Sequence, residues 1–238
     1  MISIAAVADQ VDEGLRSRAQ PERAAAERAY LKSELDHYGT SVPGTRAAVK
    51  EAVRGLELDH DTVVGLAERL WAEPVHERRA AAAELLEQQV ELLDAGDLPL
   101  LERLLRESRT WALVDNLAAS VVGPIAERDP SVTEVLDRWA DDPDFWIRRS
   151  ALLANLIALR RGAGDFERFG RYADAMLEEK EFFIRKAIGW VLRDTGRLRP
   201  DLVYEWLLPR ASRAAGLTVR EAVKYLSPDQ RAAILAAR

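Results

Sequence analysis

Apolar residues recur along this chain with a helical period. In segments such as 77–93 and 182–194 they fall at every third or fourth position, which places them on one side of a helix. Alternating apolar and polar runs typical of strands are almost absent. Three segments match the capping box that starts a helix, at Ser131–Glu134, Thr218–Glu221 and Ser227–Gln230. The pattern predicts an all-α protein.

One motif occurs twice, 37 residues apart: an acid, two aromatic residues, isoleucine and two basic residues. It begins at Asp144 in DFWIRRSAL and at Glu181 in EFFIRKAIG. Looser copies around Arg78 and Arg220 continue a spacing of about 35–37 residues. A period of this length with helical content predicts stacked helix pairs of the HEAT type, which bury their apolar faces only against neighbouring pairs. We expect a solenoid whose second helices line a concave face.

The predicted organisation is a single HEAT-like repeat domain over residues 1–238. An N-terminal helical cap occupies 1–40, stacked helix pairs occupy 41–238, and GTSVPG at 39–44 forms the loop between them. The chain has no cysteine, which excludes disulfides and thiolate metal sites and favours a reducing compartment. The N-terminus has no signal-peptide pattern, and no apolar run reaches the roughly 18–20 residues of a membrane span. We expect a soluble, cytoplasmic, monomeric protein.

Charge is distributed unevenly along the chain. The net charge is −6, which at first disfavours a nucleic-acid partner. Residues 1–140 hold 16 basic and 26 acidic residues, a balance of −10, whereas residues 141–238 hold 18 and 14, a balance of +4. Because phosphate binding depends on the charge of one face rather than on the total, the C-terminal half is compatible with DNA binding. Solvated arginine-rich helices explain the same numbers equally well.

A carboxylate interrupts the apolar segment 109–123. Asp115 lies four residues after Trp111, so an indole and a carboxylate project from the same helix face. Lys186 and Trp190 repeat this spacing in a later helix. The basic residues that the repeat would place on neighbouring helices of the concave face are Arg148, Arg149, Arg185, Lys186, Arg220 and Lys224.

These residue types suit the hydrolysis of a base–sugar bond in DNA. Arginine and lysine bind phosphates, indoles stack on bases or sugars, and a carboxylate stabilises an oxocarbenium-like transition state. An alkylated, cationic base leaves without a general acid, so one carboxylate is sufficient. Structural alternatives remain open: Asp115 would pair with an arginine of the next repeat, Trp111, Trp146 and Trp190 would fill the core, and the basic residues would form ion pairs between repeats.

Other kinds of catalytic site are not indicated. His37, His60 and His76 lie far apart with no metal-ligand spacing, and His76 is expected to be exposed or at a helix end. The chain has no glycine-rich phosphate loop and no nucleophile elbow. We expect no metal and no cofactor.

The sequence resembles the AlkD-type alkylpurine DNA glycosylases, the HEAT-like family of DNA alkylation repair. The matching stretches keep the family's order across nearly the whole chain: YLKSEL (30–35), LWAEPVHERRAAA (70–82), WALVDNLA (111–118), FWIRRSAL (145–152), EKEFFIRKAIGWVLRD (179–194) and REAVKYL (220–226). Departures are Thr110, where some relatives carry a second tryptophan, Ala112 after Trp111, and Arg148, which adds a charge beside Arg149.

The resemblance implies roles for individual residues. Asp115 matches the catalytic aspartate, which stabilises positive charge on the sugar and positions water. Trp111 matches the tryptophan that packs on the deoxyribose, and Trp190 matches the second tryptophan at the lesion. Arg149 matches the arginine that holds the DNA backbone near the lesion, and Tyr30 matches a tyrosine near the same cleft. The resemblance also implies that the base stays stacked, an exception to base flipping among glycosylases.

The sequence therefore predicts a monofunctional DNA glycosylase that removes cationic N3- or N7-alkylated purines from double-stranded DNA and leaves an abasic site. A first alternative is a self-resistance enzyme that excises bulky minor-groove adducts of a secreted alkylating metabolite. A second is a noncatalytic repeat protein that binds DNA or acts as a scaffold. The presence of Asp115 favours an active enzyme.

Overall fold

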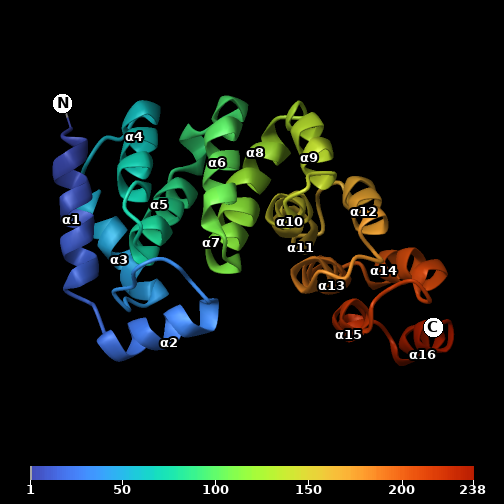
Figure 1. Ribbon diagram of the computed structural model, residues 1–238. Coiled ribbons are helices and arrows are strands. Elements are labelled where there is room, and N and C mark those ends of the chain that lie inside the picture. Colours follow the sequence, from blue (N-terminus) through green and yellow to red (C-terminus); the bar gives the residue numbers. More distant parts are fainter. Residues whose placement is uncertain (1) are drawn as a thin grey trace. The chain divides into compact units, whose positions relative to one another are not determined.

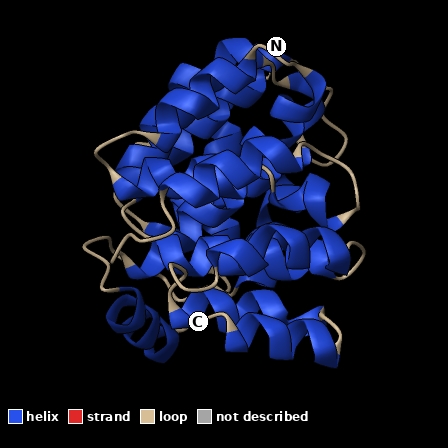
Figure 2. Ribbon diagram, turned by 90° about the vertical axis from the view of Figure 1, so that its right-hand side faces the viewer, coloured by secondary structure: helices blue, strands red, loops and turns tan. Residues whose placement is uncertain are grey.

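The computed structural model describes residues 2–238, and every regular element within that range is helical (Figure 2). The one β-type pairing among these residues is an isolated bridge between Asp36 and Val75. The prediction of an all-α fold is therefore confirmed. None of the described helices combines the length and apolarity needed to cross a membrane.

The chain divides into two compact units, one ending at Leu117 and one spanning Ala118–Arg238. The helices of the N-terminal unit (Figure 1) are α1 (Ile4–Arg16), α2 (Pro21–Leu31), α3 (Val42–Ala52), α4 (His60–Trp71), α5 (His76–Gln88), α6 (Leu98–Ser108) and α7 (Trp111–Asn116). Those of the C-terminal unit are α8 (Gly123–Arg128), α9 (Val132–Ala140), α10 (Phe145–Leu153), α11 (Leu156–Arg160), α12 (Phe166–Ala175), α13 (Phe182–Gly196), α14 (Pro200–Leu207), α15 (Gly216–Ala222) and α16 (Pro228–Ala236).

The core of the N-terminal unit follows from helical spacing. In α1, Val7, Val11 and Leu15 recur every fourth residue and are buried, because this face packs against α3 and α4. Helix α5 is buried around most of its circumference and contacts α3, α4 and α7. This central position explains why its sequence is rich in alanine, whose small side chain permits close approach of several helices.

Helix α2 differs from its neighbours because none of its residues is buried. In Figure 1 it runs across the direction of α1 and α4 at the edge of the unit. The loop that follows it is held by Glu77 of α5, whose fully buried carboxylate accepts hydrogen bonds from the backbone N–H groups of Tyr38, Gly39 and Thr40. Three such bonds satisfy backbone donors that this irregular segment leaves without helical partners.

The same loop brings two histidines together. Asp36 pairs with the strand-like residues before α5, and its backbone accepts from the N–H of His76, the first residue of that helix. The rings of His37 and His76 stack with centroids 4.6 Å apart. Burial lowers the pKa of His76 to about 4 and also lowers the pKa of His37. The prediction that the histidines lie far apart is wrong for this pair, because the contact depends on tertiary structure.

The repeated motif has the same local structure in both copies, at the starts of α10 and α13. Asp144 and Glu181 are the N-cap residues, and each side chain accepts from a backbone N–H of the first turn. The isoleucine of each copy is fully buried. Arg148 and Arg185 each reach back to a carbonyl oxygen six residues earlier, and so fix the loop that precedes the helix.

Polar contacts join positions that lie one repeat apart. In both units these contacts link residues separated by 34–36 positions, which agrees with the period in the sequence. The pairs are Glu68–Arg103 and Trp71–Glu107 in the N-terminal unit, and Glu127–Arg161, Thr133–Arg168, Asp137–Tyr172, Arg160–Asp194 and Asp174–Arg210 in the C-terminal unit. The helical-repeat architecture is confirmed, whereas the concave face and the single domain over 1–238 stay predictions.

Local predictions of helix starts had mixed outcomes. The capping box at Ser227 is present, with both reciprocal hydrogen bonds. Ser131 precedes α9 without a side-chain cap. Thr218 lies inside α15, where its hydroxyl donates to the carbonyl of Arg185, so that capping box is wrong. The loop expected at 39–44 is shorter, because α3 already begins at Val42.

We expect Asn155→Ala to destabilise the C-terminal unit. Asn155 is 1% exposed, and its Oδ1 accepts from Nε and Nη2 of Arg168, also buried, at 3.1 and 3.0 Å. Removing this acceptor leaves part of a buried guanidinium without a hydrogen-bond partner, which lowers the free energy of unfolding by about 2–3 kcal/mol. Urea denaturation measures this change. The control is Arg171→Ala, an exposed arginine 3.5 Å from Asp137, for which a change below ~0.5 kcal/mol is expected. Equal losses in both variants would show that the contact between Asn155 and Arg168 does not stabilise the unit.

Candidate functional site

The predicted reactive residues of the N-terminal unit lie on α7. The hydroxyl of Thr110 caps this helix by accepting from the N–H of Ala112. Trp111 and Asp115 share one face of the helix and are both half-buried, whereas the intervening Leu113 and Val114 are buried. The core-facing side of α7 thus holds the helix in place and leaves the indole and the carboxylate partly accessible to solvent.

A π-helical turn, Leu117–Val122, directly follows α7. Pro124 explains this widening, because proline has no N–H for the carbonyl four residues earlier and its ring would clash with that carbonyl. Turns of this kind are frequent at functional sites. The consequence is that the helical register changes immediately after Asp115.

The structure brings Tyr30 of α2 to Trp111. The two rings meet edge to face, with centroids 6.1 Å apart and planes at 86°. Tyr30 is 73% exposed, although most large apolar residues of this chain are covered. An exposed tyrosine and a half-buried tryptophan therefore adjoin the helix face that carries Asp115, and the role that the resemblance implies for them stays a prediction.

Strained basic residues flank both of these aromatic residues. Among the described residues other than glycine, only Lys32 and Arg109 have a positive φ, of 50° and 48°. Lys32 ends α2 two residues after Tyr30, and Arg109 ends α6 two residues before Trp111. Both line a cavity of about 550 Å³, together with Ser33, Glu34, Leu35, Arg79, Arg106, Glu107, Ser108 and Thr110. Left-handed backbone at residues with a Cβ is costly and is often associated with function.

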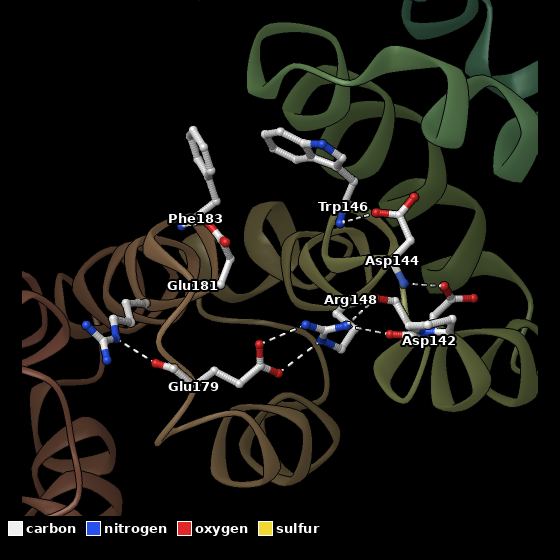
Figure 3. A network of polar contacts seen from close by, with 9 residues as sticks. Asp142, Asp144, Trp146, Arg148, Glu179, Glu181 and Phe183 are labelled. Carbon is white, nitrogen blue, oxygen red and sulfur yellow. Dashed lines mark hydrogen bonds and ion pairs between the residues drawn. The ribbon is translucent and has the colours of Figure 1, made fainter.

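Arg148 of the C-terminal unit is held by partners within that unit (Figure 3). Its guanidinium makes a bidentate pair with Glu179, at 3.0 and 2.9 Å, and donates to the carbonyls of Asp142 and Pro143. In the same view the rings of Trp146 and Phe183 point in one direction, with centroids 4.8 Å apart. The geometry of Arg148 therefore supports the ion-pair interpretation rather than a free phosphate contact.

The other basic residues of the motif differ in accessibility. Arg149 is 1% exposed and donates to the carbonyl of Phe183, so its side chain is part of the contact between α10 and α13. Arg185 is half-buried, and its Nε donates to the carbonyl of Glu179 at 2.6 Å. Lys186 is exposed, with Nζ 5.8 Å from the ring centroid of Phe182. Accessible charge at this motif is thus concentrated at Lys186.

Trp190 lies on α13 and is half-buried. Its Nε1 donates to Asp194, one helical turn later, at 3.2 Å, and Asp194 also pairs with Arg160. By contrast, Trp71 and Trp139 are almost completely buried and fill the core. Because Trp111 and Trp190 retain exposed ring surface, they do not have the burial expected of core tryptophans.

Arg220 and Lys224 are exposed on α15 and on the helical turn that follows it. Helix α15 packs closely on α13 at Gly189, where an added Cβ would lie 3.2 Å from the backbone of Thr218. The structure therefore places Lys186 on α13, and Arg220 and Lys224 on α15 and the turn after it, which both contact α13, with all three side chains exposed to solvent.

Sequence reasoning missed several residues of these sites. No sequence pattern indicated Lys32 or Arg109, because the positive φ of these residues can be recognised only from the backbone conformation. Glu179 lies in the family stretch 179–194, but no spacing in the sequence indicated that it pairs with Arg148. Asp194 was missed as the partner of Trp190, although their i, i+4 spacing could have indicated it.

Comparisons with known proteins place this helical-repeat architecture in a class of DNA repair proteins. The family model for DNA alkylation repair enzymes matches residues 11–226. The chain therefore belongs to the DNA alkylation repair enzyme family, and its role is in the repair of alkylated DNA, with DNA as the partner that this role implies. Among curated proteins, no sequence matches this chain.

Two solved structures share the fold. A predicted DNA alkylation repair enzyme from Enterococcus faecalis is 23% identical, with a TM-score of 0.77 over 89% of this chain and 98% of that one. AlkD2 from Streptococcus mutans is 17% identical, with a TM-score of 0.60 over 87% of this chain and 99% of that one. At these identities the likeness establishes the fold alone.

We expect Arg148→Ala and Lys224→Ala to have opposite effects. Losing the four hydrogen bonds of Arg148 lowers the unfolding free energy by about 2–3 kcal/mol and leaves the salt dependence of DNA binding unchanged. Losing the exposed charge of Lys224 changes stability by less than ~0.5 kcal/mol and reduces the salt slope by about 1. Urea denaturation and fluorescence anisotropy with duplex DNA measure both quantities. A reduced slope with intact stability in Arg148→Ala would make Arg148 a phosphate contact.

We expect Arg109→Gly to raise stability and weaken DNA binding. Glycine adopts φ of 48° without steric cost, so the unfolding free energy rises by about 1 kcal/mol, while a positively charged side chain that lines the cavity of about 550 Å³ is lost. Arg109→Lys is the matched control, because it keeps both the charge and the strained backbone. Thermal melting and anisotropy check the two effects. A glycine variant that binds DNA as tightly as the unmodified protein would exclude Arg109 from the DNA contact.

Proposed function

We propose that this protein is a monofunctional DNA glycosylase that hydrolyses the N-glycosidic bond of cationic N3- or N7-alkylated purines in duplex DNA. The observation that carries the proposal is the half-buried carboxylate of Asp115, one turn after Trp111 and on the same helix face, with exposed Tyr30 against the indole. Family membership supports DNA as the substrate, and the residue types support cleavage at a sugar.

In the proposed reaction the bond between C1′ of the deoxyribose and the alkylated base breaks first. The base takes the bonding electrons and leaves as a neutral purine, so no general acid is required. Asp115 stabilises the positive charge that develops on the sugar, and it accepts the proton lost when water adds to C1′. The products are a free base and an abasic site, without a lysine nucleophile or a strand-cleavage step.

The aromatic side chains have a role that matches their exposure. The face of Trp111 stabilises the sugar as positive charge develops, a contact worth about 0.5–2 kcal/mol. Because this chemistry acts on the sugar and backbone, the base stays stacked in the duplex. Exposed cations such as Lys186, Arg220 and Lys224 bind phosphates.

Asp115→Asn tests the proposal most directly. The amide keeps the shape of the side chain and removes its charge, so the single-turnover rate of base release from methylated duplex DNA falls by about 10²-fold or more. DNA affinity stays within about threefold, because the charge acts mainly on the transition state. The readout is chromatographic detection of the free base, with anisotropy for binding.

Asp141→Asn is the matched control, since Asp141 is an exposed aspartate that the proposal does not use. If base release by Asp115→Asn stays within about twofold of the unmodified protein, an effect near 0.4 kcal/mol, the catalytic assignment is wrong. If the unmodified protein binds methylated and bulky-adduct duplexes and releases no base from either, it is a DNA-binding scaffold. Release from the bulky-adduct duplex alone would indicate the self-resistance activity.

A further inference from the structure

A second cluster of chemically reactive side chains lies in the N-terminal unit, away from α7. It consists of Glu27 on α2, His37 in the following loop and Glu77 on α5. One carboxylate oxygen from each glutamate and one ring nitrogen of the histidine all lie within 4.8 Å of one another. Three elements separated by up to fifty residues thus direct ligand-type atoms to one point.

The histidine of this cluster has unused hydrogen-bonding capacity. Both ring nitrogens of His37 are shielded from solvent and have no hydrogen-bond partner, and the same is true of Nδ1 of the stacked His76. Buried polar atoms without partners are rare, and each requires an explanation such as a bound ion. A neutral imidazole nitrogen is one of the commonest metal ligands.

The two carboxylates concentrate negative charge at the same point. Glu77 is fully buried and, within the described part of the chain, makes no ion pair with lysine or arginine. Its three backbone donors leave a lone pair available on Oε2. Glu27 pairs with Arg23 through Oε1 only. Arg23 already balances Glu27, so a cation would compensate the charge of Glu77, because a buried anion without a cation is costly.

A cavity adjoins the two glutamates of the cluster. About 200 Å³ of space is lined by both glutamates and by His76, which is 9% exposed, together with Thr40, Thr45 and Asn116. Oδ1 of Asn116 is another buried acceptor without a partner. The cavity is large enough for an ion and the water molecules that complete its coordination.

We propose that Glu27, His37 and Glu77 bind one first-row divalent metal ion of the zinc class. Two carboxylate oxygens and one imidazole nitrogen form a donor set that such ions accept, with about 2.0–2.2 Å to each ligand and water in the remaining position. Ligand atoms on one such ion lie about 3–3.5 Å apart, so a small closure of the cluster completes the site. The half-exposed side chain of Glu27 is the part that moves.

The structural consequence of the ion is the attachment of α2. This helix buries none of its residues, and it carries Tyr30 against Trp111. A metal that joins Glu27 to Glu77 and His37 would fix α2 on α5 without an apolar core. The site therefore stabilises a helix rather than performing chemistry, and it does not depend on the proposed glycosylase activity.

Zinc binding to the full-length protein tests the proposal. The protein is freed of metal by chelator dialysis and titrated with Zn²⁺ by isothermal calorimetry, without DNA. We expect one equivalent to bind and the amides of α2 to exchange hydrogen more slowly afterwards. His37→Ala and Glu27→Gln should each weaken binding by at least about tenfold. Glu77→Gln is not used, because this carboxylate also holds the backbone of the loop.

Matched controls separate this site from other acidic surfaces. His60→Ala removes a histidine that also lies between two carboxylates, Asp61 and Asp97, but whose ring nitrogens already have these partners. Glu22→Gln removes an exposed glutamate of the same helix as Glu27. Both controls should bind zinc like the unmodified protein.

Absence of one-to-one binding would overturn the proposal, as would unchanged affinity in both site variants. An equal loss of zinc affinity in His60→Ala would also overturn the proposal, because it would show that the ion binds at His60. If His37→Ala does not fold, Glu27→Gln decides the result, because its side chain is half-exposed and removes no core packing. Base release is measured in a separate assay, so a protein that does not bind zinc could still be shown to be a glycosylase.

Discussion

Each helix pair of this protein has an apolar face that only the adjacent pair can cover, and the remaining features of the fold depend on this constraint. Burial by neighbours sets the distance in sequence between contacting residues, which is why polar contacts recur at 34–36 positions. The apolar contact supplies most of the stabilisation, and the polar pairs fix the register of one repeat against the next. A chain organised in this way keeps many long side chains at defined positions.

Features that depend on neighbouring residues were predictable from the sequence. Helical periodicity, the acid before each aromatic pair and the shared face of Trp111 and Asp115 all arise within one or two helical turns, and the repeat near 36 residues is visible as a recurring motif. The capping box at Thr218 failed because the same hydroxyl bonds to Arg185 in the preceding repeat. The local pattern predicted a helix start at Thr218, but a contact across repeats places this residue inside the helix.

Contacts between distant segments were not predictable without the fold. The stacking of His37 on His76 depends on a backbone bridge between the loop after α2 and the start of α5. The meeting of Tyr30 with Trp111 was anticipated only through resemblance, because no spacing rule relates positions eighty residues apart. Likewise, the basic residues shared one pattern in the sequence, yet burial separates them into structural arginines such as Arg149 and accessible cations such as Lys224.

The absence of buried residues in α2 affects how the sequence of this protein can change. Core helices tolerate few substitutions, since each altered volume disturbs their neighbours. In α2, most substitutions leave the core untouched, so this segment is free to vary provided that its few anchoring side chains are kept. Tyr30 lies on α2, and its ring contacts Trp111. This contact joins the variable helix α2 to α7, whose position is fixed by core packing. Divergence among relatives would therefore accumulate beside α7 at little cost in folding stability.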